Sequence, residues 1–254
     1  MRFKGISALT ATELTMIWRN KTVAVTAVGM PLATSGYFAF SNRRVGNGGW
    51  VSFVALQVLV MLLFSVYIAA TTTLTARRQE LFLKRLRSGE ASDAVILLGT
   101  LLPVILLVFG QTLVLFGITT AAGNPPPRSV LLLLVAIFGG AVMCCAVAAV
   151  TSAITPSAET AQVTTAPFLF ATFGGGLWVL FTPADQVSTL MLAAPGGAIT
   201  DLIRRAWSTT SPTGGEPALL DQLAHAGPSM LALLVWTLVA AAVAFRLFRW
   251  EPRH

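Results

Sequence analysis

The chain has 254 residues, of which 55% are hydrophobic and only 11% are charged, and its formal net charge is +7. A soluble domain carries about a quarter Asp, Glu, Lys and Arg, so this composition argues against a soluble enzyme or binding domain. The charges lie in short clusters between long apolar runs, which indicates a protein whose main solvent is lipid.

Six segments lack Asp, Glu, Lys and Arg and are long enough to cross a bilayer, for which about 20 apolar residues suffice. Lipid offers backbone groups no hydrogen-bond partner, so these segments must be helices, and they do not alternate as barrel strands do. We therefore predict a single all-α integral membrane domain with six transmembrane helices. The predicted spans cover residues 22–42, 50–76, 94–120, 129–154, 160–182 and 228–248.

Residues 1–20 precede the first of these spans. Phe3, Ile6 and Leu9 recur there at near-helical spacing among polar residues, which predicts an amphipathic helix lying on the membrane surface. The alternative is a flanking segment without a structure of its own. The segment does not resemble a removable signal, because its charges are scattered and the first long apolar run begins only after Lys21.

The basic residues divide unequally between the two sides of this arrangement. Six spans place both termini on one side, which receives twelve of the 17 Lys and Arg residues, while the other side receives five. The twelve are Arg2, Lys4, Arg19, Lys21, Arg77, Arg78, Lys84, Arg85, Arg87, Arg246, Arg249 and Arg253, and the five are Arg43, Arg44, Arg128, Arg204 and Arg205. Because cytoplasmic loops carry the excess of basic residues, we predict cytoplasmic termini. The positive charge then reflects orientation and attraction to anionic lipid, and no nucleic-acid partner is expected.

Residues 77–92, between the second and third spans, are the most highly charged internal connection. Glu80 stands four residues before Lys84, a favourable helical pairing, and Gly89 is suited to end a helix. This pattern predicts a short cytoplasmic helix on which a partner docks, and the alternative is a basic loop that only sets orientation. Glu159, before the fifth span, is either an acid favoured by the helix dipole or a further partner contact.

The outer segment 183–227 differs from the other connections. Its first half is too apolar for a solvated loop, yet Pro195, Gly196 and Gly197 interrupt it, which prevents one continuous crossing. We predict two short re-entrant helices that dip partway into the outer leaflet. The second half is rich in turn residues and is expected to be exposed.

The sequence lacks the motifs of an enzyme. None of the three lysines follows a glycine, so the chain has no phosphate-binding Gly-Lys-Ser/Thr loop. The adjacent Cys144 and Cys145 do not form a four-ligand metal site, and we expect no catalytic residue, metal or cofactor in this chain. Polar amides inside the spans, at Gln57, Gln111 and Gln162, either tie helices together or line a translocation path.

Four motifs follow one another in the order found in a known family. The first is Trp18-Arg19-Asn20-Lys21, which precedes a span that contains Pro31, and the second is Glu80 to Leu86, which is followed by Gly89, Asp93 and Leu97-Leu98-Gly99. The third is Ser157-Ala158-Glu159-Thr160-Ala161 before the fifth span, and the fourth is Pro195 to Trp207 before the last span. In this order they resemble the permeases of ATP-binding-cassette (ABC) type-2 exporters, also called type V exporters. The resemblance covers the whole chain, and Leu81 and Phe82 stand where the family pattern has Gly-Thr.

The resemblance implies an export permease that forms a half-channel in a bacterial-type cytoplasmic membrane. A second permease, identical or different, would complete the path, and two soluble ABC ATPase subunits would bind ATP and Mg. Residues 77–92 would be the coupling helix. The implied contacts to the ATPase are Glu80, Phe82, Lys84, Arg85, Leu86, Arg87 and Glu159.

Two other classes of function stay open at this stage. The chain could be a membrane anchor or assembly factor without a conduction path of its own. It could also be an ion-coupled carrier, although such carriers hold an ionisable group near the bilayer centre, and the six spans contain no Asp, Glu or Lys and only one Arg, Arg246, close to the end of the last span.

Overall fold

The computed structural model describes residues 49–81, 93–208 and 219–247, together with the single positions 29, 33, 34, 36 and 37. Within these ranges the chain is helical and has no strand, and five helices are long and apolar enough to cross a membrane. The all-helical membrane fold is therefore confirmed. The predicted surface helix (1–20) lies outside the described residues, as does the predicted first span (22–42) apart from those five positions.

The second span is a single run of helix from Gly49 to Gln79. It consists of α4 (Gly49–Met61), a π-helical stretch η3 (Leu62–Ile68) and α5 (Ala69–Gln79). Long π-helical stretches are rare and usually interrupt α-helices at functional positions. The run extends past the predicted end at residue 76, so Arg77 and Arg78 belong to this helix and not to a separate one.

The next three helices agree with the predicted spans to within one residue at either end. They are α7 (Asp93–Ala121), α8 (Val130–Ile154) and α9 (Ala161–Phe181). The Ser129 side chain caps α8 by accepting a hydrogen bond from the Leu132 N–H at 3.4 Å, as the sequence of a helix start favours. Pro103 and Pro167 lie inside α7 and α9 without ending them, which membrane helices tolerate.

The last helix, α12 (Leu219–Leu247), begins well before the predicted residue 228. Pro228 lies inside α12 and does not end it. Contacts with the start of α8 stabilise the additional turns: Ser129 Oγ donates to Gln222 Oε1 at 2.5 Å, and Ala226 is fully buried. Residues 219–227 are therefore helical, and the connection before the last span is shorter than predicted.

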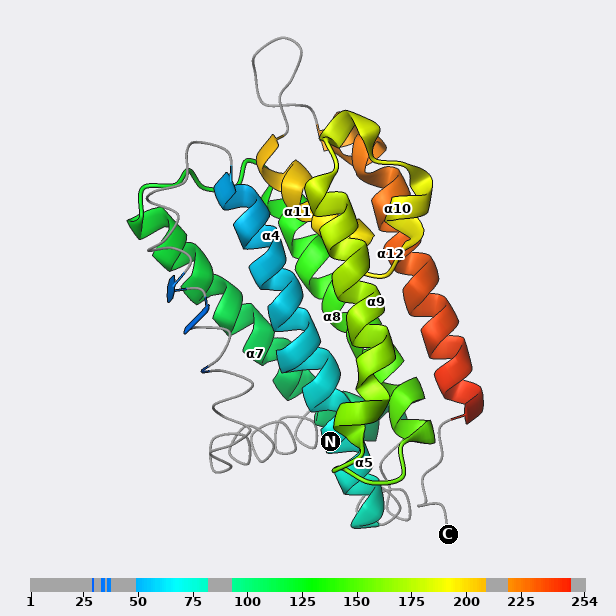
Figure 1. The fold of residues 1–254 in the computed structure, drawn as a ribbon. Helices are drawn as coiled ribbons and strands as arrows, with labels where there is room; N and C mark the ends of the chain where they lie inside the picture. Colours follow the sequence, from blue (N-terminus) through cyan, green and yellow to red (C-terminus); the bar gives the residue numbers. More distant parts are fainter. Residues whose placement is uncertain are drawn as a thin grey trace.

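Successive long helices run in opposite directions (Figure 1). The run α4–α5 descends in this view, α7 ascends, α8 descends, α9 ascends and α12 descends. One end of the bundle, drawn at the bottom and here called the lower end, therefore collects the end of α5, the start of α7, the α8–α9 connection and the end of α12. The opposite, upper end carries three short helices between α9 and α12.

The core lies around α8, which packs against α5, η3, α11 and α12. Small residues let these helices approach closely: a Cβ added at Gly140 would lie 2.8 Å from the Leu62 side chain. Cys144 and Cys145 are free and buried in the same helix. Close contact through small residues is typical of helix packing in membranes, where dispersion takes the place of the hydrophobic effect.

Candidate functional site

The upper end is built around a broken helical hairpin. It consists of η4 (Ala184–Gln186), α10 (Thr189–Ala193) and α11 (Gly197–Ser208), and α11 contacts α4, α8, α9 and α12. Two short α-helices, α10 and α11, thus lie in this segment together with the 3-10 turn η4, and their depth in a membrane stays a prediction.

The turn between α10 and α11 lies against the backbone of α9. Gly196 has φ +82°, and a Cβ added to it would lie 2.1 Å from the Thr172 carbonyl oxygen. On the α9 side, a Cβ added to Gly175 would lie 2.2 Å from the Pro195 carbonyl oxygen. Backbone atoms cannot move aside as a flexible side chain can, so glycine is required on both sides of this contact.

Charged side chains of α11 hold the neighbouring helices. Arg204 Nη1 donates to the carbonyl oxygens of Val179 and Thr182 at 2.6 and 2.9 Å, which satisfies acceptors at the end of α9. Asp201, 3% exposed, accepts from Arg205 Nε at 2.6 Å and from Ser229 Oγ of α12 at 2.5 Å. Thus α11 is tied to α9 and α12 by different side chains.

The same helix is tied to the α7–α8 connection. Trp207 Nε1 donates to the Pro125 carbonyl oxygen at 3.0 Å, and the Ser129 N–H donates to the Ala206 carbonyl oxygen at 2.9 Å. The α11 helix is therefore the element that joins the upper ends of the others.

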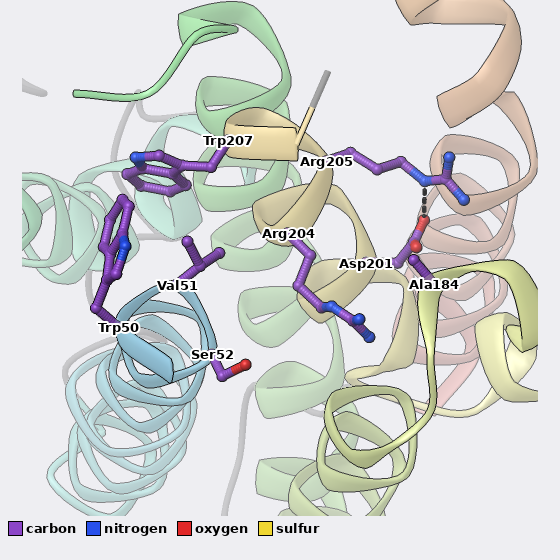
Figure 2. A pocket seen from close by; sticks show the side chains of 8 residues that line it. All are labelled: Trp50, Val51, Ser52, Ala184, Asp201, Arg204, Arg205 and Trp207. Carbon is purple, nitrogen blue, oxygen red and sulfur yellow. Dashed lines mark hydrogen bonds and ion pairs between the residues drawn. The ribbon is translucent and has the colours of Figure 1, made fainter. Parts of the chain in front are cut away.

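A cleft of about 320 Å³ opens beside α11 (Figure 2). Its lining residues are Trp50, Val51, Ser52, Ala184, Asp201, Arg204, Arg205 and Trp207. Trp50 and Trp207 meet edge to face on one side, with ring centroids 5.5 Å apart, the Arg205–Asp201 pair lies on the other side, and Arg204 projects between them. Indole rings at this level are typical of a membrane–water interface, and the charged groups serve the helix contacts just described.

The buried Asp201 was not anticipated from the sequence. Asp201 lies outside the six apolar segments, in the segment 183–227. The one available signal was its spacing from Arg205, four residues later, which is a favourable helical ion pair. Its contact with Ser229 joins residues 28 apart, which no local pattern reveals.

At the lower end, Glu80 follows the last residue of α5. Its carboxylate pairs with Arg77 at 3.1 Å, the residue three positions before it on the same helix. Leu81 then takes a positive φ of 55°, which breaks the helix. The remaining predicted ATPase contacts in this segment, Phe82, Lys84, Arg85, Leu86 and Arg87, lie outside the described residues.

Glu159 lies in the α8–α9 connection and is exposed. The structure brings this connection against the end of α5: the Ala158 N–H donates to Gln79 Oε1 at 3.2 Å. Since Gln79 precedes Glu80 and Ala158 precedes Glu159, the two predicted acidic contacts come from segments that touch. Their proposed role in binding an ATPase stays a prediction.

The three glutamines lie in different surroundings. Gln57 is 2% exposed, and its Nε2 donates to Thr34 Oγ1 at 2.9 Å, which connects the second helix to a residue of the predicted first span. Gln111 is 3% exposed, inside α7. Gln162 is exposed on the first turn of α9. The structure therefore does not bring the three amides together, and Gln162 alone of the three lies at the surface of the chain.

With this geometry in place, the family can be assigned. The model of the family described as ABC-2 family transporter protein matches residues 12–246, which is nearly the whole chain. The chain belongs to the ABC-2 transporter family. No curated protein and no solved structure matches it, so the assignment rests on the family model. Membership confirms the resemblance seen in the sequence and identifies a transport protein of the membrane that is not itself an enzyme.

Several helices of this ABC-2 protein expose apolar side chains, and α9 does so along its whole length. Val163, Phe170, Trp178 and Phe181 of α9 are 77, 69, 46 and 82% exposed, and they recur at helical spacing. Such a face is compatible with lipid or with another membrane helix, because both are apolar.

Proposed function

We propose that the chain is the membrane-spanning permease subunit of an ATP-driven exporter. The observation that carries this proposal is the ABC-2 family match over residues 12–246. The chain itself has no Gly-Lys pair, so ATP and Mg would be bound by separate ATPase subunits, for which the family membership provides the expectation.

The lower end of the bundle is the proposed cytoplasmic side. Arg77, Arg78 and Arg246 lie at that end, and the twelve-to-five division of basic residues supports the same orientation. The hairpin α10–α11 would then lie in the outer leaflet as a re-entrant segment. The host membrane would be a bacterial-type cytoplasmic membrane.

The proposed ATPase surface comprises Glu80, residues 82–87 and the neighbouring Glu159. Glu80 and Glu159 are exposed at the same end of the bundle, and the contact between Gln79 and Ala158 supports one shared surface. A second permease, identical or different, would complete the translocation path. The exposed face of α9, which begins beside Gln162, is the surface we assign to that partner and path.

A pull-down of the tagged chain from native membranes tests this proposal. We expect a small soluble ATPase to purify with the chain and to hydrolyse Mg-ATP. A chain that purifies from bilayers without any ATPase would contradict the proposal and would favour an anchor or assembly factor.

The same assay tests the docking surface. Removing an interface anchor costs about 2 kcal/mol or more, roughly thirtyfold in affinity, so we expect Glu80→Lys to weaken ATPase binding by about this factor. Arg246→Gln is the matched control, because Arg246 is exposed at the same end but on α12. Equal recovery of ATPase with both variants would show that Glu80 is not part of the interface.

A further inference from the structure

Among the described residues, the most deeply buried charged side chain at the lower end is Arg78. It is 2% exposed, and its Nη2 donates to the carbonyl oxygen of Thr155, the residue that follows α8. A guanidinium loses much hydration free energy when it is buried, whereas an arginine that only sets orientation has no need to leave water. Its burial therefore indicates a function in joining α5 to the α8–α9 connection.

The next residue makes a second link to the same connection. Gln79 Oε1 accepts from the Ala158 N–H at 3.2 Å. The two links hold backbone groups on either side of Ser157, and backbone groups cannot move without moving the chain. The last turn of α5 is therefore attached at two points to the segment that leads into α9.

The connection is itself braced. The Ser157 N–H donates to Thr160 Oγ1 at 3.1 Å, Thr160 Oγ1 donates to the Ser157 carbonyl oxygen at 2.9 Å, and Thr164 Oγ1 donates to the Thr160 carbonyl oxygen at 2.7 Å. These bonds join the turn to the first turns of α9. A displacement applied at Thr155 and Ala158 is thus passed to α9 with little local deformation.

A further contact joins the second span to α8 and α9 at Tyr67 in η3, about three helical turns before Arg78. Tyr67 hydroxyl and Thr151 Oγ1 are hydrogen-bonded at 3.0 Å, and the Tyr67 ring packs on Phe168 of α9 with ring centroids 5.0 Å apart. Together with the links at Arg78 and Gln79, these contacts make the lower halves of α5, α8 and α9 one packed unit.

We infer that Arg78 is a positioning residue which, together with Gln79, couples the end of α5 to the start of α9. This inference rests on the proposed function, in which an ATPase pushes on the segment beginning at Glu80. The push enters α5 directly, and the two links carry it to α9, the helix that exposes Gln162 and Val163. If the hydrogen bonds of Arg78 and Gln79 are lost, the ATPase stays bound, but the displacement that it causes is confined to α5.

The test places one thiol reporter on each side of the links. Leu81→Cys reports on the end of α5, and Val163→Cys reports on the start of α9; Leu81 and Val163 are 43% and 77% exposed. Each reporter is introduced separately into a chain with Cys144→Ala and Cys145→Ala, as the complex with its co-purified ATPase in lipid nanodiscs. The rate of maleimide labelling is measured with and without a non-hydrolysable ATP analogue.

In the otherwise unchanged chain, we expect the analogue to alter the labelling rate at both reporters. Arg78→Met should leave the response at Leu81→Cys intact and reduce the response at Val163→Cys by about tenfold, which corresponds to ~1.4 kcal/mol of lost coupling. Arg78→Lys, which retains a cationic donor, should recover part of the response. Gln79→Ala, which alters an exposed side chain and so avoids a folding defect, should reduce the response in the same direction.

Arg246→Gln serves as the control, since it removes a positive charge at the same end without touching the links. A full response at Val163→Cys in both Arg78→Met and Gln79→Ala would overturn the inference and leave the proposed function standing. So would a response confined to Leu81→Cys in the otherwise unchanged chain. An analogue that alters neither reporter would contradict the proposed function itself.

Discussion

Two single residues of this chain, Leu81 and Asp201, have features that a pattern of apolar helices does not explain: a positive φ and a buried carboxylate. Leu81, the second residue after α5, adopts φ 55°, a conformation that costs a residue with a Cβ about 1–2 kcal/mol. At the other end of the bundle, the Asp201 carboxylate is nearly fully buried and bonded to two side chains. Each position predicts a measurable effect of substitution.

Leu81→Gly should raise the thermal unfolding midpoint of the purified chain, because glycine takes a positive φ without steric cost. We expect a gain of about 1 kcal/mol. Leu98→Gly is the matched control, since Leu98 is exposed on α7 and helical, and glycine there should lower stability by about 1 kcal/mol. If both variants unfold at a lower temperature, Leu81 is not strained.

Asp201→Ala should destabilise the chain strongly, because it leaves Arg205 without its carboxylate and Ser229 without its acceptor. Removing one partner of a fully buried ion pair costs about 3–5 kcal/mol, and we expect a smaller loss here because the remaining Arg205 is 29% exposed and partly hydrated. Asp201→Asn retains an acceptor and should cost less. Asp185→Ala removes an exposed carboxylate of η4 and should change the unfolding midpoint little. Equal effects of Asp185→Ala and Asp201→Ala would show that the hydrogen bonds from Asp201 to Arg205 and Ser229 do not stabilise the chain.

At the scale of elements, backbone approach decides how the upper end is built. The α10–α11 turn reaches α9 because Gly175 and Gly196 present no side chains to each other's helix. The position of this turn then places Arg204 at the end of α9 and Asp201 beside α12. The short amphipathic helix α11 is thereby held by specific polar contacts as well as by its apolar face.

Adjacent glycines of α9 offer a matched comparison of this close approach. Gly175→Ala places a Cβ 2.2 Å from the Pro195 carbonyl oxygen, and we expect it to lower the unfolding midpoint by an amount equivalent to about 1–3 kcal/mol. Gly174→Ala meets nothing within 4 Å and should stabilise the helix by up to about 1 kcal/mol. Equal midpoints for the two variants would show that the turn packs elsewhere.

At the scale of the whole molecule, antiparallel long helices place every connection at one of two ends. The lower end collects the basic end of α5, the connection with Glu159 and the end of α12. The upper end carries α10, α11 and the cleft lined by Trp50, Trp207 and Arg204. The molecule therefore separates the end that carries the proposed docking surface from the end that carries the short helices.

This separation predicts opposite accessibility of the two ends in cells. In a chain with Cys144→Ala and Cys145→Ala, we expect an impermeant thiol reagent to label Ala184→Cys in intact cells and Leu81→Cys only after permeabilisation. Both positions are exposed, one in η4 and one after α5. Labelling of Leu81→Cys in intact cells would reverse the proposed orientation.

The sequence alone predicted the bounds of α7, α8 and α9 closely. The ends of α7, α8 and α9 lie within one residue of the expected bounds, because a lipid solvent forces every long apolar segment to satisfy its backbone within one helix. The order of motifs likewise indicated the ABC-2 family. Both results depend on local composition and chain order, which the sequence states directly.

Only the tertiary structure decided which polar groups are paired. Arg78 meets Thr155 across 77 positions of sequence, and Asp201 meets Ser229 across 28. The early start of α12 similarly depends on Gln222 reaching Ser129. These contacts depend on how the helices turn their faces toward one another. That rotation is set by close packing and by the cost of leaving a buried polar group without a partner, and neither is visible in local periodicity.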